Sequence, residues 1–275
     1  MTLCHHPDLG RSVRSSLTFA QIQGRTHLMG QHTPHPFHIT RPFRHPHDPQ
    51  GMVTLYLQSS SGGLYGDDDL ALAVRVEAGA AVHLTTQAST VVHDARGRHG
   101  TRQLVTLDVA EGALLEYLPD PSILMAGARL GTRIDARLAP GATLMLADAQ
   151  MWHDPEGRGR HFDWLESEIQ INGADRPLLL ERFTVEGEAW LKRTGGFRCA
   201  GMVLVAGDIR AADQMQKAAD EVPELYAGLS ILADRDIAIL RFLAQDGVAL
   251  SRALKSIWAA ARLALTGQKP AARRK

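Results

Sequence analysis

The stretch SSSGGLYGDDDLALAVRVEAGAAVHLTTQAST, Ser59–Thr90, contains the pattern that decides the fold. A strand-like run covers Leu70–Val76, and a second strand-like run ends on the paired residues Thr85 and Thr86. Alternation of apolar and polar residues is typical of strands that bury one face. A turn centred on Gly79 separates the two runs, because glycine adopts the positive φ of a tight turn without steric cost. The stretch therefore predicts a strand, a turn and a returning strand.

The same pattern recurs twice further along the chain. Three segments align on their glycines: Val76-Glu-Ala-Gly79-Ala-Ala-Val82, Val109-Ala-Glu-Gly112-Ala-Leu-Leu115 and Leu138-Ala-Pro-Gly141-Ala-Thr-Leu144. The glycines lie 33 and 29 positions apart, so each repeat has room for several short strands. This spacing predicts a mainly β fold, an irregular stacked β-sheet superhelix that resembles a solenoid, or a layered sandwich. Independent β-hairpins with Gly-Ala turns are the alternative.

The chain divides into three parts, with no linker that would separate two domains. Residues 1–50 form a histidine- and proline-rich N-terminal arm with the first strand, and residues 51–210 form a β-rich core. Residues 211–275 form a small helical C-terminal part. Proline residues at 34, 36, 42, 46 and 49 predict extended or loop structure through the second half of the arm.

Hydrophobic periodicity predicts the remaining elements. Strands are expected at Leu165–Ile171 and Leu178–Val185, and a strand pair at Leu191–Ile209. The segment AADQMQKAAD, residues 211–220, has the composition of a helix. Apolar residues follow helical spacing through Leu229–Leu265, where Gly247 is expected to separate two helices.

Composition argues against several classes of protein. Lysine and arginine number 30, as do aspartate and glutamate, whereas a nucleic-acid-binding protein usually carries a basic excess. Two cysteines are too few for a disulfide framework or a cysteine-built zinc site. No apolar run approaches the ~20 residues of a membrane helix, and the N-terminus lacks the apolar segment of a secretory signal. We therefore expect a cytoplasmic protein that binds neither nucleic acid nor membrane.

Histidines are concentrated in the first 50 residues, which contain eight of the 13. Imidazole is a ligand for nickel, zinc and copper, so the arm is a candidate metal-binding segment. The candidate ligands are His32, His35, His38, His45 and His47. The alternative is a proline-rich loop whose polar positions are histidine, because no pair has the i, i+4 spacing that would fix two ligands on a helix.

Three consecutive acids, Asp67, Asp68 and Asp69, precede the first strand of the quoted stretch. They could bind a hard cation, or they could form a solvated turn. Nucleophile elbow, Walker, His-Glu-x-x-His and dinucleotide-binding motifs are missing, and a hydrolase built on these acids would lack spaced metal ligands. The chain is therefore expected to be an interaction protein and not an enzyme.

Several segments resemble the urease accessory protein UreD family, also called UreH. SGGLYGDDDLALAVRVEAGAAVHLTTQASTVVHDA, residues 61–95, resembles the family signature of paired glycines, a glycine-aspartate step, alternating apolar residues and paired threonines. GALLEYLPDPSILMAGARL at 112–130, ING followed by PLLLER within 171–182, and SIWAAARLALTG at 256–267 are similar to later family segments. The resemblance spans about residues 20–267 as a single domain.

The resemblance implies a scaffold chaperone with a β-rich superhelical fold and no catalytic centre. Family members bind apo-urease and join UreF and the GTPase UreG for GTP-dependent nickel insertion. No tightly bound cofactor is implied, and nickel would pass transiently. Asp68, Thr85, Thr86 and Glu181 match polar positions of the family motifs and are expected to line a passage or contact a partner. The alternative is a histidine-arm nickel- or zinc-binding protein, or a sensor, on the same scaffold.

Overall fold

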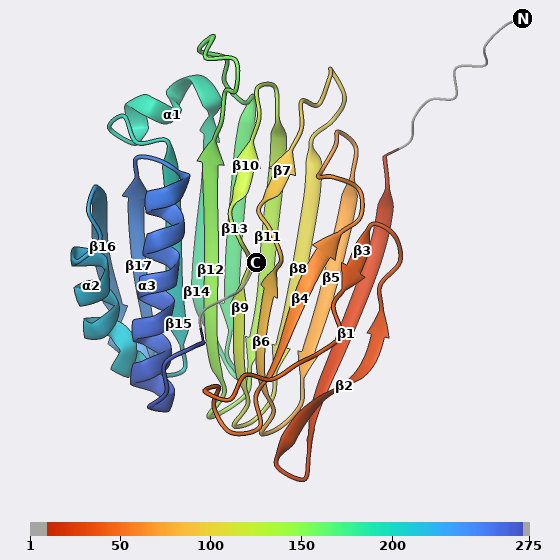
Figure 1. Cartoon of the computed structure of the whole chain (residues 1–275), viewed down its shortest axis with the longest axis vertical. Coiled ribbons are helices and arrows are strands. Elements are labelled where there is room, and N and C mark those ends of the chain that lie inside the picture. Colours follow the sequence, from red (N-terminus) through yellow and green to blue (C-terminus); the bar gives the residue numbers. More distant parts are fainter. Residues whose placement is uncertain (1–9, 272–275) are drawn as a thin grey trace, which may run out of the picture.

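Two β-sheets packed face to face form the protein, and helices cover one outer face (Figure 1). The computed structural model describes residues 10–271. In order across the seven-stranded sheet lie β14 (Pro177–Glu186), β13 (Trp164–Asn172), β11 (Arg129–Leu138), β8 (Thr101–Val109), β5 (Asp69–Val76), β1 (Ser12–Ile22) and β2 (Arg25–His32).

The ten-stranded sheet lies opposite. Its main order is β16 (Leu225–Leu232), β17 (Ile237–Ala244), β15 (Cys199–Ala206), β12 (Thr143–Trp152), β9 (Leu114–Leu118), β6 (Ala81–Thr86), β4 (Val53–Ser59) and β3 (Phe37–Ile39), and β10 (Ser122–Leu124) pairs with β12 and β7 (Thr90–Val92). The helices are α1 (Gly187–Arg193), α2 (Ala212–Asp220) and α3 (Gly247–Thr266), with 3-10 turns at Ile209–Ala211 and Ala233–Arg235. Both α2 and α3 pack on the outer face of this sheet.

The predicted strand–turn–strand repeat is the stacking unit of the fold. β5, β8 and β11 lie side by side in the seven-stranded sheet, and the strands that follow their turns, β6, β9 and β12, lie side by side in the other sheet. Neighbouring units pair in parallel, so Val76 lies beside Val109 and Val109 beside Leu138. Each turn therefore carries the chain from one sheet to the other. The stacked interpretation is confirmed, and the hairpin alternative is wrong.

The three aligned glycines support this stacking through their backbone conformation. Gly79, Gly112 and Gly141 have φ values of 68°, 63° and 70°, a region that glycine enters without the clash a side chain would cause. Successive turns are joined by backbone hydrogen bonds, in which the Ala110 amide donates to the carbonyl of Val76 at 2.9 Å. The turns thus form a ladder of their own along one end of the sandwich.

Two predicted elements at the C-terminal end are wrong. Leu191–Ile209 holds the end of α1 and a single strand, β15, instead of a strand pair. Leu229–Ala244 forms most of the antiparallel strands β16 and β17 instead of a helix. β17 is buried on both faces, because Ile239 packs between the sheets and Leu240 packs under the helices. An apolar run buried on both sides carries no period that separates strand from helix. Gly247 begins α3 and does not separate two helices.

Other expectations are confirmed. α2 lies within the segment that was expected to be helical, and β13 and β14 occupy the two strands expected after residue 164. The proline-rich segment is mainly loop and contains only the short edge strand β3. The first strand expected within residues 1–50 is β1, which contributes Leu17 and Phe19 to the core.

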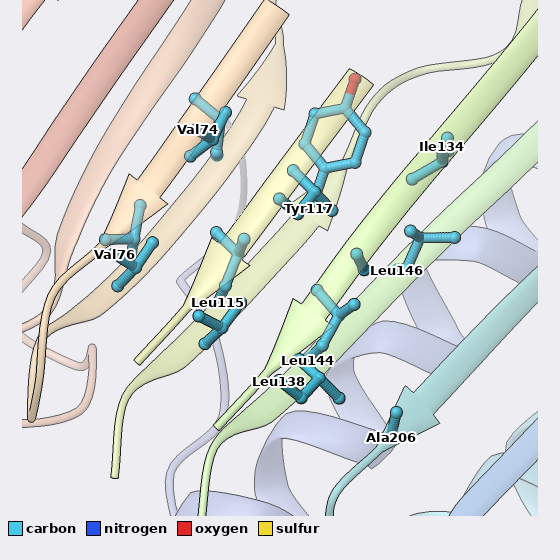
Figure 2. Close-up of a cluster of buried hydrophobic side chains, with 14 of the residues drawn as sticks. Val74, Val76, Leu115, Tyr117, Ile134, Leu138, Leu144, Leu146 and Ala206 are labelled. Atoms are coloured by element: carbon cyan, nitrogen blue, oxygen red, sulfur yellow. The ribbon is translucent and has the colours of Figure 1, made fainter. Parts of the chain in front are cut away.

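The main core lies between the two sheets. Figure 2 shows Val74, Ile134, Leu115, Leu144 and their neighbours from both sheets directed into one layer. A second cluster fills the space between the ten-stranded sheet and helices α2 and α3. A third cluster, which includes Leu70, Leu130 and Leu165, lies between the sheets toward the end opposite the glycine turns.

A buried ionic cluster attaches α3 to the ten-stranded sheet. Arg262 of α3 donates to Glu116 of β9, with an Nε–Oε1 distance of 2.7 Å, and to Asp48, with an Nη1–Oδ1 distance of 2.7 Å. His83 Nδ1 lies 2.7 Å from Glu116 Oε2, and Trp258 Nε1 donates to the same oxygen at 3.0 Å. Burial disfavours the charged form of Glu116, but hydrogen bonds from His83 and Arg262 outweigh it and lower the pKa of Glu116 to about 2.

Replacing Arg262 by methionine tests this attachment. Arg262→Met leaves two buried carboxylates without their cation, and we expect it to reduce the free energy of unfolding by about 3–5 kcal/mol. Arg252→Met, at an exposed position of the same helix, is the control and should stay within about 0.5 kcal/mol of the wild type. Urea unfolding followed by circular dichroism measures both. Equal midpoints for the two variants would contradict the role of the cluster.

Candidate functional site

A row of polar side chains crosses the space between the two sheets. In the seven-stranded sheet, Gln103, Thr132 and Ser167 lie side by side on neighbouring strands, because Gln103 pairs with Thr132 and Thr132 with Ser167. Each stands two residues before an apolar residue that packs between the sheets, so its side chain faces the same interior. The row separates the main core from the third cluster.

The ten-stranded sheet contributes three further polar side chains to this interior. Tyr117 of β9 and Asp148 and Gln150 of β12 share the face of Leu144 and Leu146. Figure 2 shows the Tyr117 ring within the core and its hydroxyl directed away from Leu115. We call these residues, with the three of the facing sheet, the polar layer: Gln103, Thr132, Ser167, Tyr117, Asp148 and Gln150.

Asp148 is the only acid of the polar layer, and it joins the two sheets. Ser167 Oγ donates to Asp148 Oδ2 at 2.9 Å, and Gln150 Nε2 donates to Asp148 Oδ1 at 2.7 Å. Within residues 10–271, no cation forms an ion pair with this carboxyl group. Burial raises the pKa of Asp148, and its hydrogen bonds from Ser167 and Gln150 only partly oppose the rise. The layer therefore offers carboxyl, hydroxyl and amide oxygens without a protein cation to neutralise the carboxylate.

A cleft of about 640 Å³ leads from the surface to one side of the polar layer. Its mouth lies where β6 ends and β7 begins, and includes Thr86, Gln87 and Ser89. Gln103 and Tyr117 of the polar layer line the same cleft. Among the described residues, the lining of the cleft includes no carboxylate, lysine or arginine; it contains His38 and is otherwise hydroxyl, amide and apolar.

On the opposite side of the sandwich, an ion pair joins the edge strand β14 of one sheet to β17, the strand next to the edge, of the other. Glu181 of β14 accepts from Arg241 of β17, with an Nε–Oε1 distance of 2.8 Å, and Arg241 also donates to Ser230 at 3.3 Å. Along the ten-stranded sheet, Met202 separates Arg241 from Asp148. We call the Glu181–Arg241 contact the seam. Both side chains are partly exposed there.

Thr86 and Glu181 are the two expected site residues that adjoin the polar layer. Thr86 faces the interior and lines the cleft, where its hydroxyl accepts from the Asp120 amide at 2.7 Å. Thr85 faces the opposite way, and its buried hydroxyl donates to the carbonyl of Leu118 at 2.6 Å. Cleft and seam thus each hold one of the expected residues.

Asp68 lies outside the polar layer, in the turn before β5. Its buried carboxylate accepts from Arg11, with an Nε–Oδ1 distance of 2.8 Å, and from the Tyr65 amide at 2.9 Å. Burial opposes ionisation of Asp68, but the Arg11 hydrogen bond and the amides lower its pKa overall. Arg11 also donates to the carbonyl of Gly63 at the cleft. Asp68 therefore holds the beginning of the described chain against one rim of the cleft.

The neighbouring acids have separate partners. Asp67 accepts from the His99 amide at 3.0 Å, and Asp69 pairs with Arg14 at 2.5 Å. Together with Asp68 under Arg11, the three carboxylates each bind a different residue. The acids therefore lie in a turn, as the second interpretation expects, but Asp68 is buried and not solvated.

The candidate histidine ligands are distributed over β2, β3 and the loops around them. His35 Nδ1 lies 3.0 Å from Ser60 Oγ, and the His45 ring packs edge-on against Phe43 at 5.2 Å. Across residues 10–271, no three histidine, cysteine or acidic side chains gather closely enough to hold a metal ion. His5 and His6 lie outside the described residues. In the same part of the chain, no helix is both long and apolar enough to cross a membrane.

Sequence reasoning missed Asp148, Ser167 and the rest of the polar layer. The signal was present in LMLADAQMW, where Asp148 and Gln150 continue the alternation begun by Leu144 and Leu146. Polar residues at core-facing positions of a strand need a partner inside the protein, which marks them for attention. Their facing partners on other strands became identifiable only once the sheet order was known.

Comparison with known proteins gives one consistent result. A family model described as UreD urease accessory protein matches residues 12–275. Urease accessory protein UreD 1 of Methylorubrum populi is 41% identical over 275 residues, covering 97% of this chain and 93% of the relative. Proteins of the same description from a Bradyrhizobium species (39% identical; 97% and 96% covered) and Pseudomonas syringae pv. tomato (36% identical; 92% and 91% covered) are also similar.

Asparagine at position 148 tests the electrostatics of the polar layer. Because the folded-state pKa of Asp148 is raised, its neutral form stabilises the fold below the ordinary aspartate pKa of about 4, and that contribution is lost as pH rises through the raised pKa. We expect Asp148→Asn to be at least as stable as the wild type at pH 7. The free energy of unfolding of the variant should increase relative to that of the wild type from pH 4 to pH 8. Urea midpoints across this range measure the effect.

Asp108→Asn is the matched control, because Asp108 lies outside the polar layer on β8 and half-exposed beside Arg75. Asp108→Asn should not become progressively more stable than the wild type, by urea midpoint, as pH rises from 4 to 8. An Asp148→Asn variant that becomes less stable than the wild type toward pH 8 would refute the assignment of an uncompensated carboxyl group.

Proposed function

This chain belongs to the family of UreD urease accessory proteins, and we propose from that membership that it acts as a scaffold chaperone in urease maturation. It binds apo-urease and joins UreF and the GTPase UreG in a complex that inserts nickel with GTP hydrolysis. It works by binding instead of catalysis, without a tightly bound cofactor, in the cytoplasm. Nickel is its cargo.

The observation that carries the nickel part of the proposal is the uncompensated Asp148 carboxyl group inside the sandwich. A divalent cation that reaches Asp148 supplies the charge partner that the described chain lacks. The surrounding ligands are neutral oxygens of Ser167 and Gln150, which hold a cation more weakly than several carboxylates or imidazoles would. Weak binding suits passage, because a transported ion must also leave.

The proposed route follows the polar side chains between the sheets. The ion enters at the cleft beside Thr86, passes Gln103 and Tyr117, and reaches Asp148. Beyond Asp148 the route runs past Met202 to the seam. Thr86 and Glu181 take part at the two sides of this route, whereas Asp68 shapes one rim of the cleft through Arg11.

The main test replaces Asp148 in a complete urease system. Asp148→Leu removes the carboxylate and both hydrogen bonds, and we expect urease activation to fall about tenfold, the loss of one charge-assisted contact. Complexes with apo-urease, UreF and UreG should survive, because the substitution is internal. Asp108→Asn should activate urease like the wild type. Specific urease activity per bound nickel ion and co-purification measure the two effects.

Two results would contradict the proposal in different ways. Full activation by a folded Asp148→Leu variant removes Asp148 from the nickel route but leaves the chaperone role standing. A wild-type chain that captures neither apo-urease nor UreF and UreG, with intact urease activation after its deletion, refutes the chaperone role itself.

Obstructing the cleft tests the entrance. Ser89 is exposed at the mouth, so Ser89→Trp adds an indole there without entering the core. We expect slower activation at limiting nickel and partial recovery at high nickel, because a narrowed entrance reduces the rate of entry. Ser16→Trp, exposed on the outer face of β1, is the control and should leave the rate unchanged. Indistinguishable rates at limiting nickel would exclude this cleft as the entrance.

A further inference from the structure

In the described part of the chain, four strands end the main strand order of the two sheets, and three of these four have features that discourage pairing with another chain. An edge strand exposes unpaired backbone N–H and C=O groups, which proteins protect by shortness, charge or proline. β3 has only three residues, β2 begins with Arg25, and β14 begins with Pro177 and carries Glu181 and Arg182. β16, with the sequence LYAGLSIL, has eight residues and neither charge nor proline.

β16 is also unusually apolar at its surface. Tyr226 is 70% exposed and Ile231 is 46% exposed, and a Cβ atom built on Gly228 would meet nothing within 4 Å. The facing sheet ends at β14, whose Phe183 is 38% exposed, and the seam joins β14 to β17, the neighbour of β16. β16 therefore has one free edge, at the left end of Figure 1, near the exposed Phe183 of the facing sheet.

A second copy of this chain fits that edge poorly. Helix α2 packs over β16, on the outer face of the sheet. Two β16 strands paired about a twofold axis would lie about 4.8 Å apart, whereas packed helices need about 8–10 Å between their axes. Because α2 packs over both β16 and β17, such pairing would place a second α2 close beside the first. An extended segment of a different protein occupies only the plane of the sheet and meets no such obstacle.

Charges at one end of β16 indicate what such a segment would carry. Asp220, Glu221 and Glu224 are exposed just before the strand, and none of them pairs with a cation within the described range. The strand itself is uncharged. A complementary segment is therefore apolar over the strand, with lysine or arginine at the end that meets these acids.

We propose that β16 is a docking edge, at which an extended, uncharged segment of a partner protein adds antiparallel as a further strand and is followed by lysine or arginine near Glu224. Main-chain hydrogen bonds provide the affinity, and Tyr226 and Phe183 receive apolar side chains of the segment. This inference rests on the proposed function, because it specifies how one protein of the urease assembly is held. The bound segment lies beside the seam, at the far side of the polar layer from the cleft.

A matched pair of glycine substitutions tests the proposal. Gly228→Lys places a charge in the middle of β16, and Gly30→Lys does the same in the edge strand β2. Both glycines are exposed and have room for a side chain, since the nearest atom to a Cβ at Gly30 is 3.7 Å away. Each full-length variant is mixed with apo-urease, UreF and UreG, and the retained partners are quantified after purification.

We expect Gly228→Lys to weaken retention of at least one partner by about tenfold or more, and Gly30→Lys to bind like the wild type. Backbone amides of residues 225–232 should exchange hydrogen more slowly in the wild-type complex than in the free chain. Tyr226→Lys provides a second variant if Gly228→Lys does not fold, as judged by urea unfolding.

Equal retention by Gly228→Lys and the wild type, or unchanged exchange in β16 within the complex, would overturn the docking edge while leaving the chaperone role intact. A wild-type chain that retains none of the three partners would overturn both.

Discussion

Parallel pairing between successive strand–turn–strand units is the constraint on which the rest of the structure depends. Because each glycine turn carries the chain to the opposite sheet, the neighbouring strands β5, β8 and β11 of one sheet and β6, β9 and β12 of the other come from successive units. Their side chains then meet in register, so a residue type repeated at one position of the unit becomes a row across the sheet. Val76, Val109 and Leu138 form such an apolar row near the turns. Gln103, Thr132 and Ser167 form a polar one further along the same strands.

Two acids of this fold, Glu116 and Asp148, have opposite surroundings. Glu116, beneath α3, meets Arg262, His83 and Trp258, and these contacts hold it ionised. Asp148, between the sheets, accepts only from neutral donors within residues 10–271. An uncompensated carboxyl group costs stability that a serine or leucine at the same position would not. The attachment of α3 to the sheet thus explains the ionic cluster around Glu116. Asp148 provides no structural stabilisation of similar size. Its position is therefore better explained by function.

Much of the fold could be predicted from local pattern, because the strand–Gly–strand repeat and the alternating runs both depend on neighbouring residues. β17 could not be predicted in this way, because Ile239 and Leu240 are buried on opposite faces and the apolar segment of the strand has no hydrophobic period. The site was harder to predict from the sequence. Thr86 and Glu181 were reached through family motifs and lie at the two sides of the polar layer, but Asp148 acquires meaning only beside Ser167, which is 19 positions later and on the other sheet. Such pairs depend on sheet order, which no single stretch of sequence encodes.

The ionic contact between Asp48 and Arg262 joins residues 214 positions apart and has a consequence for synthesis on the ribosome. Nearly the whole chain must emerge before α3 can reach the ten-stranded sheet. Until then, the outer face of that sheet exposes Met145, Val203 and Leu240, and Glu116 has no arginine. The nascent protein therefore passes through a stage in which its strands have formed but the apolar outer face of the ten-stranded sheet is exposed to solvent. A chain that stops short of its last helix would keep that surface, and would be a natural target for proteolysis.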